Sequence, residues 1–212
     1  MTEPLNTQTV GAFLDVLASS APAPGGGSVA ALSGAMAAGL VSMVCALTIG
    51  KKQFAEIEED AKAIQARAER LRQELQQLAQ DDVAVFERLA AAYKLPRTTD
   101  ADAASRRAAI QKITRQATDV PLRTARSAAQ IIPLCTALVN HVGRLIVSDV
   151  GVAALLARAT VQSALLNVEI NLAGLEDRMY VNDVRAQIED LSVGLADEAD
   201  GIAHIVRARI NA

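Results

Sequence analysis

From Ser28 to Gly50 the chain contains no Asp, Glu, Lys or Arg. A helix of this length is long enough to cross a lipid bilayer. The stretch is rich in Ala, Gly and Ser, however, which are weakly lipophilic, and no aromatic belt flanks it. We therefore predict a helix buried at the centre of a bundle, where small side chains allow neighbouring helices to approach closely.

The composition of the 212-residue chain favours helices throughout. Apolar residues make up 51% of the chain and aromatic residues only 2%, so helix formers such as Ala and Leu outnumber aromatic strand formers. The sequence contains neither an internal repeat nor a segment with the alternation typical of a strand. The expected fold is all-α, an up-and-down bundle of long helices in which residues 1–212 form a single domain.

A second long helix is predicted from about Phe54 to Lys94, because apolar residues recur there at intervals of three and four. This heptad pattern predicts a seam that packs against a neighbouring helix. The seam residues are Phe54, Ile57, Ala61, Ile64, Ala68, Leu71, Leu75, Leu78, Asp82, Val85, Leu89 and Ala92. Asp82 is the charged member of this otherwise apolar set.

The remaining helices are predicted from capping residues and prolines. One runs over about 102–118, and Asp119 is predicted to cap the next, with Pro121 in its first turn and a kink at Pro133. Ser148 is predicted to cap an apolar helix that reaches about residue 175. A last helical region over about 178–209 closes the bundle.

Asp82 stands where the seam pattern calls for Leu or Ala. Burial of an unpaired carboxylate costs several kcal/mol or shifts its pKa. Two hypotheses remain open. In the structural one, Asp82 faces solvent or pairs with Arg115 or Arg123; in the functional one, it lies in a site that makes use of its perturbed environment.

The segment Pro24-Gly25-Gly26-Gly27-Ser28 opens directly onto the predicted central helix. Glycines let a ligand approach the backbone closely, and the free N–H groups at a helix N-terminus attract anions. No Lys-Ser/Thr pair follows at P-loop spacing and no strand precedes the segment, so neither nucleotide-binding motif is predicted. The alternative is a tight chain reversal with Ser28 as the N-cap.

Asn167 and Asn171 lie four residues apart in an otherwise apolar run, so they share one face of a helix. A buried Asn requires hydrogen-bond partners. These two side chains either fix the packing of the bundle or read a heteroaromatic ring.

With a net charge of −3, the chain lacks the excess of Lys and Arg that is typical of nucleic-acid-binding proteins. Cys45 and Cys135 lie in apolar surroundings typical of buried hydrophobic residues, and His141 and His204 lack a metal-ligand spacing. We therefore predict no metal site. The N-terminus lacks the features of a secretory signal, so a cytoplasmic location is expected, with no membrane partner.

Seven segments together carry a family resemblance. They are Ala23–Ser28, Ser33–Lys52, Asp82–Phe86, Leu95–Pro96, Thr118–Leu122, Ser148–Ala157 and Leu166–Leu172. With them the chain resembles the C-terminal family of formiminotransferase-cyclodeaminases, which includes stand-alone bacterial methenyltetrahydrofolate cyclohydrolases. The resemblance covers most of the chain, and its glycine-rich segment is quite specific.

The resemblance implies an all-α homodimer that binds folate. It implies either hydrolysis of 5,10-methenyltetrahydrofolate to 10-formyltetrahydrofolate, or cyclisation of 5-formiminotetrahydrofolate with loss of ammonia. The family's catalytic aspartate falls on Asp82. Because no formiminotransferase domain accompanies the sequence, the cyclohydrolase is the reaction we expect first.

The site predicted from these observations has two catalytic candidates, Asp82 and Lys51. No cofactor is expected beyond the tetrahydrofolate substrate. The predicted substrate-binding residues are Pro24, Gly25, Gly26, Gly27, Ser28, Lys52, Asp149, Asn167 and Asn171.

One segment departs from the family pattern. Family members commonly carry a Gly-Asn pair shortly before the Ser-Asp of the next helix, whereas this chain reads Val142-Gly143-Arg144-Leu145, with Gly143 in the place of the asparagine. Two alternatives to a cyclohydrolase follow. The chain could be a folate-binding homologue with weakened catalysis, or a purely structural helical dimer.

Overall fold

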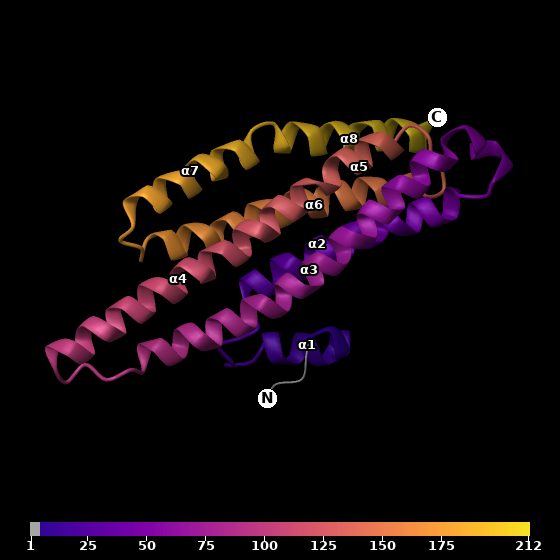
Figure 1. Ribbon diagram of the computed structural model, residues 1–212. Helices are drawn as coiled ribbons and strands as arrows, with labels where there is room; N and C mark the ends of the chain where they lie inside the picture. Colours follow the sequence, from indigo (N-terminus) through magenta and orange to yellow (C-terminus); the bar gives the residue numbers. More distant parts are fainter. Residues whose placement is uncertain (1–4) are drawn as a thin grey trace.

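The computed structural model describes residues 5–212, and these form a bundle of helices without any strand (Figure 1). The all-α prediction is confirmed. The α-helices are α1 (Val10–Leu17), α2 (Gly26–Thr48), α3 (Glu58–Tyr93), α4 (Asp100–Ala129), α5 (Ile131–Leu138), α6 (Val147–Leu172), α7 (Arg178–Ser192) and α8 (Leu195–Asn211). Two short 3-10 helices, η1 (Leu5–Thr7) and η2 (Lys52–Ile57), precede α1 and α3.

The charge-free helix α2 lies at the centre of the bundle, between α3 and α6. Its small residues allow the close approach. A Cβ atom added to Gly34 would lie 3.0 Å from Thr160 Cγ2 on α6 and 3.2 Å from the δ-carbons of Leu75 on α3. Both α2 and α6 are long and apolar enough to cross a membrane, but about half of each apolar window, 56% and 50%, is buried in the bundle. The prediction of a core helix is confirmed for the buried half of α2.

The heptad seam of α3 faces this core, as predicted: Leu71, Leu75 and Leu78 are fully buried. The helix begins later than expected, at Glu58 instead of Phe54. Phe54 has a non-helical backbone within η2, so Phe54 and Ile57 precede the α-helix and are only half-buried.

The predicted helix boundary at Asp119 is wrong, because α4 runs unbroken through Pro121. A proline inside a helix leaves the carbonyl four residues earlier without its N–H donor. In this structure the Asn171 side chain on α6 donates to that carbonyl, Ala117 O, at 2.8 Å. The next break, at Gln130, comes three residues before Pro133, where the proline ring would meet the carbonyl of Ala129.

One other predicted boundary differs from the structure. Helix α6 begins at Val147 with Ile146 as its N-cap, so Ser148 lies inside the first turn and does not cap it. The closing helical region predicted over about 178–209 consists of two helices, α7 and α8, which are separated at Gly194 by a left-handed backbone with φ 70°.

The two cysteines behave as buried hydrophobic residues, as predicted. Cys45 on α2 and Cys135 on α5 are free and buried, and both belong to the main core. Burial raises the pKa of the Cys45 thiol to about 11 and that of Cys135 to about 12. Both thiols therefore stay protonated at neutral pH and are poor nucleophiles.

A substitution at Leu75, which contacts Gly34, tests the packing of α2 against α3. We expect Leu75→Ala to lower the free energy of unfolding by about 2–5 kcal/mol, because the cavity that it leaves between α2 and α3 cannot collapse. Urea denaturation measures the change. Met179→Ala is the control: Met179 is 86% exposed, and its loss should change the free energy by less than about 0.5 kcal/mol.

Candidate active site

A cavity of ≈ 320 Å³ lies where the N-terminal end of α2 meets α3, α4 and α6. Its volume is at the lower end of the range for small-molecule sites. Asp82 and Phe86 line it from α3, and Asn167 and Asn171 line it from α6. The segment from Pro22 to Gly27 contributes another wall through Pro22, Ala23, Gly25, Gly26 and Gly27.

Asp82 is held at this cavity by Ser28. The Ser28 hydroxyl lies 2.8 Å from Asp82 Oδ2 and 3.2 Å from the carbonyl oxygen of Ala79, and its single proton can be donated to either. Ser28 is fully buried in the first turn of α2, whose N-cap is Gly25. The predicted role of Ser28 as an N-cap is therefore wrong, because its hydroxyl is directed to α3 instead.

The structural hypothesis of an arginine partner for Asp82 is also wrong. Arg115 pairs with Asp177 at 3.2 Å, and Arg123 lies 3.7 Å from Glu74. Both arginines are thus engaged with other carboxylates.

Burial raises the pKa of Asp82 above the ordinary value of an aspartate. Hydrogen bonds from the hydroxyl and backbone N–H of Ser28 lower it by less than burial raises it. The net effect is a carboxylate that is more basic than a solvated one. A carboxylate of this kind, at a cavity wall and beside a helix N-terminus, is suited to accept a proton from a bound molecule.

Gly27 allows this arrangement because its lack of a side chain lets the carboxylate touch the backbone of α2. A Cβ atom at position 27 would lie only 2.2 Å from Asp82 Oδ1 and 2.6 Å from Cγ. Any other residue would displace the carboxylate. The glycine-rich segment is therefore required at Gly27 by the position of Asp82, whereas Gly25 has open space around it.

The two asparagines differ in their partners. Asn167 Nδ2 donates to the Ser163 carbonyl of its own helix at 2.9 Å, and Asn171 Nδ2 donates to Ala117 O on α4. Each amide keeps its carbonyl oxygen and a second N–H hydrogen for another partner. Both residues are half-buried at the cavity wall, so they can offer a donor and an acceptor to a heterocycle.

Phe86 is a cavity residue that the sequence reasoning did not single out. It lies four residues after Asp82, on the same face of α3, and is 40% exposed. An exposed aromatic side chain one turn from a half-buried carboxylate is suited to stack on a flat ring. The spacing of four residues from Asp82 is the sequence signal that could have identified Phe86.

The structure does not bring all predicted site residues together within one chain. Lys51 and Lys52 follow the C-terminal end of α2, whereas Asp82 lies at its N-terminal end. At about 1.5 Å per residue, α2 separates Lys51 from Gly27 by roughly 35 Å. Asp149 is in the first turn of α6, which runs antiparallel to α2, so it too lies at the lysine end.

The connector Val142–Leu145, which departs from the family pattern, lies at the same end of the bundle as Lys51 and Asp149. A Cβ atom added to Gly143 would be 3.6 Å from Phe54 Cζ, an ordinary contact, so the position has room for a side chain. Within one chain the connector is remote from the cavity at Asp82.

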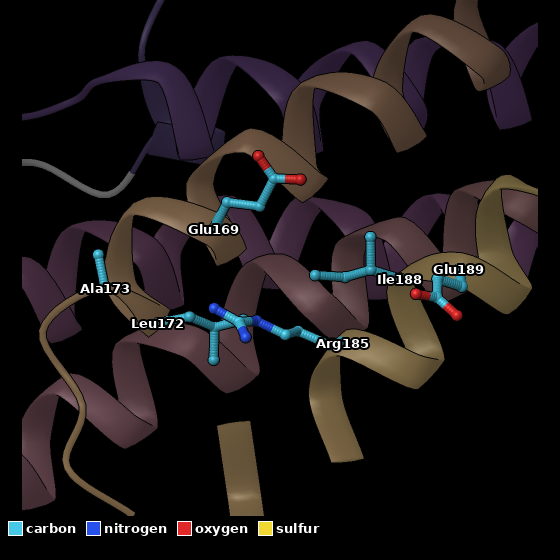
Figure 2. A pocket seen from close by; sticks show the side chains of 6 residues that line it. All are labelled: Glu169, Leu172, Ala173, Arg185, Ile188 and Glu189. Atoms are coloured by element: carbon cyan, nitrogen blue, oxygen red, sulfur yellow. The ribbon is translucent and has the colours of Figure 1, made fainter. Parts of the chain in front are cut away.

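A second cavity, of ≈ 330 Å³, lies between α6 and α7 (Figure 2). Arg185 and Glu189 line it from α7, but Glu169 on α6 points away from both of them. Its titratable residues, Glu169, Arg185 and Glu189, are all exposed, whereas Asp82 is half-buried. The cavity at Asp82 is therefore the better candidate for chemistry.

Comparisons with known proteins show the family of the chain. The family model for formiminotransferase-cyclodeaminase matches residues 9–190. The chain is 43% identical over 204 residues to a methenyltetrahydrofolate cyclohydrolase of Methylorubrum extorquens, covering 96% of this chain and 98% of the relative. It is 34% identical to the formimidoyltransferase-cyclodeaminase of Sus scrofa over 94% of this chain but only 36% of that longer protein.

A solved structure agrees with these matches. The crystal structure of a formiminotetrahydrofolate cyclodeaminase from Thermotoga maritima superposes with a TM-score of 0.81 at 26% identity, and 97% of each chain is covered. The fold, the family model and the sequence match along almost the whole chain agree. The chain belongs to the formiminotransferase-cyclodeaminase family.

Proposed function

We propose that this protein is a methenyltetrahydrofolate cyclohydrolase, which hydrolyses 5,10-methenyltetrahydrofolate to 10-formyltetrahydrofolate in one-carbon metabolism. The observation that carries the proposal is the carboxylate of Asp82, whose pKa is raised and which lies at a cavity wall. It occurs in a chain that matches a cyclohydrolase along almost the whole length of both proteins. The family indicates the class of enzyme and of substrate, and the roles of the individual residues are our proposal.

The reaction requires a base beside a cationic carbon. The one-carbon bridge of the substrate is an electrophilic amidinium, and water must add to it while losing a proton. Asp82 accepts that proton and stabilises the positive charge of the bridge. The hydroxyl of this adduct then loses its proton to solvent as the C=O bond forms and the bond from the carbon to N5 breaks. The formyl group stays on N10, and Asp82 returns its proton to N5.

The other cavity residues position the substrate. Ser28 holds the carboxylate, Phe86 stacks on the pterin, and the free amide groups of Asn167 and Asn171 read its ring edge. Pro24, Gly25, Gly26 and Gly27 shape the loop beside Asp82. These roles require no group besides the tetrahydrofolate substrate.

A second candidate is formiminotetrahydrofolate cyclodeaminase. The observation in its favour is the solved cyclodeaminase that shares this fold over 97% of the chain. The same carboxylate would serve it, because ring closure with loss of ammonia also needs a positioned proton carrier. We place the cyclohydrolase first because the relative with 43% identity carries that activity in its name.

We also propose that the protein works as a homodimer in the cytoplasm. The support for a dimer is the apolar face that α2 and α6 leave uncovered, where Met36, Leu47, Leu166 and Ile170 are all at least 40% exposed.

The decisive assay offers methenyl- and formiminotetrahydrofolate side by side. We expect the wild-type protein to accelerate loss of the methenyl compound, followed by its absorbance. Asp82→Asn should reduce that rate roughly 10²–10⁴-fold, because it removes the proton acceptor. Asp81→Asn is the matched control: Asp81 accepts from Gln77 at 2.9 Å, outside the cavity, and should keep full activity.

The melting temperature separates a lost base from a lost fold. Because burial disfavours the charged form of Asp82, Asp82→Asn should not lower the melting temperature at pH 7. A wild-type protein that leaves both substrates at their spontaneous rates would refute the proposed function. Activity on the formimino compound alone would select the cyclodeaminase.

The pH profile tests the role of Ser28. Activity requires the ionised carboxylate, so it is lost as the pH falls through the pKa of Asp82. Hydrogen bonds from Ser28 lower that pKa, and Ser28→Ala should therefore shift the acidic limb of kcat/KM to higher pH. Ser42→Ala, a change of the same kind in the same helix but remote from the cavity, should leave the limb in place; a limb unmoved by Ser28→Ala contradicts the role.

A further inference from the structure

A buried proline lies inside α4, close to the cavity at Asp82. Pro121 interrupts the hydrogen bonding of a helix that continues beyond it to Ala129. Inside a helix, proline is the least favourable residue, because it lacks the N–H that would donate to the carbonyl four residues earlier. Here that acceptor is Ala117 O. Ala117 is buried and lines the cavity, so its carbonyl needs a donor from elsewhere in the protein or from a bound molecule.

The missing donor comes from another helix. Asn171 on α6 donates from Nδ2 to Ala117 O at 2.8 Å. The nearest hydroxyl group of α4 serves a different acceptor, because Thr118 Oγ1 donates to Thr114 O at 2.9 Å. The bond from Asn171 therefore replaces the backbone amide that Pro121 lacks.

This bond determines how the Asn171 amide is oriented. A carbonyl oxygen can only accept, so the nitrogen of the amide must face Ala117 O and its oxygen must face away from it. Asn171 is half-buried at the cavity wall, and its Oδ1 accepts from no residue within 5–212. This oxygen is not one of the buried unpaired atoms either, so it is accessible to a molecule in the cavity.

Asn167, one turn earlier on α6, has the same orientation for a different reason. Its Nδ2 donates to the carbonyl of Ser163 in its own helix at 2.9 Å. Among the described residues that line the cavity, the polar side chains are those of Asp82, Asn167 and Asn171, and each of them offers an oxygen. A cavity of this kind suits a ligand that carries several N–H donors or a positive charge.

The substrate of the proposed function has such a set of donors. The pyrimidine ring of a tetrahydropterin carries an amino group at C2 and an N–H at N3, side by side on one edge, whereas its carbonyl at C4 only accepts. An amide oxygen that is held in place selects the N–H edge. An amide that is free to turn could bind either edge, because a half-turn about its last bond exchanges donor and acceptor.

We propose that Pro121 is a positioning residue of the site: it leaves Ala117 O to Asn171, and this bond holds the Asn171 oxygen toward the cavity as an acceptor for the N–H edge of the pterin. Pro121 does not itself line the cavity, so it acts through Asn171. The identity of the ligand rests on the function proposed above, whereas the orientation of Asn171 does not. In the competing explanation Pro121 only shapes α4, since prolines also bend helices.

The first experiment needs no folate and measures the melting temperature of Asn171→Leu in two backgrounds. With Pro121 present, this change leaves Ala117 O without its donor, and the melting temperature should fall by roughly 2–6 °C. In the Pro121→Ala background, the backbone N–H of position 121 donates to Ala117 O, so Asn171→Leu should lower the melting temperature much less. Equal losses in the two backgrounds would show that the two positions are not coupled, which overturns the proposal.

The second experiment measures steady-state kinetics with methenyltetrahydrofolate. Pro121→Ala should raise KM roughly three- to tenfold and keep kcat, because the Asn171 amide is no longer held and uniform binding is weakened. Pro133→Ala is the matched control: Pro133 also lies inside a helix, α5, but it is exposed and outside the cavity, so KM should not change.

The same assay shows whether Pro121 acts through Asn171. In the Asn171→Leu background, Pro121→Ala should raise KM no further, because the amide that it would release is absent. A further rise by the same factor contradicts the positioning role. An unchanged KM in Pro121→Ala alone contradicts it as well.

The third experiment identifies the atom that the ligand uses. Asn171→Asp replaces the amide with a carboxylate, which only accepts. With Pro121 present, this carboxylate would face Ala117 O, and the melting temperature should fall. In the Pro121→Ala background the carboxylate is free to accept from the ligand, and KM should return to within about threefold of the wild-type value.

Asn171→Leu in that background has no acceptor and should keep the raised KM. Equal KM values for Asn171→Asp and Asn171→Leu in the Pro121→Ala background would show that the ligand does not use an acceptor at this position, and they would overturn the proposal.

The melting temperatures and the kinetics fail separately. Coupled melting temperatures in a protein that leaves both folates at their spontaneous rates keep the orientation of Asn171 and reject the proposed reaction. Uncoupled melting temperatures in an active enzyme reject the role of Pro121 and keep the reaction.

Discussion

The close approach of α2 to both of its neighbours is the constraint on which the rest of the structure depends. At Gly34 there is no room for a Cβ atom between Leu75 and Thr160 without displacement of one of them. Small residues along α2 therefore set the distance between α3 and α6, and the positions of α4, α5 and α8 follow because they pack on those two helices. A large side chain in the buried face would separate the layers and expose the leucines of α3.

The same constraint creates the site. Within its first turn, α2 has no side chain at Gly27, so the carboxylate of Asp82 can touch the backbone there, and Ser28 fixes that carboxylate from the same turn. The fold loses some stability by holding a charge there, since burial works against the ionised form. Proteins accept such a loss at functional positions and compensate for it elsewhere, which here is the leucine-rich part of the same seam.

Much of this arrangement could be predicted from the sequence, and the failures have physical causes. The heptad pattern predicted the buried face of α3 and singled out Asp82, because periodicity reports directly on which side of a helix is buried. The boundary predicted at Asp119 failed because Asn171, fifty residues away, supplies the donor that Pro121 lacks. The motifs alone group Lys51 with Asp82, although the helix predicted between Lys51 and the glycine-rich segment is long enough to separate them within one chain.

The hairpin of α3 and α4 projects past the other helices at the end that carries the cavity (Figure 1). From residue 84 to 113 only Val85 and Ala92 are buried. Few apolar contacts hold this part, so it opens at low free energy and its amides exchange with solvent sooner than those of the core. Phe86 and Leu89, which line the cavity, belong to it. One wall of the cavity is thus compliant while the wall with Asp82 and α2 is rigid, and the cavity can widen for a bulky ligand without disturbing the base.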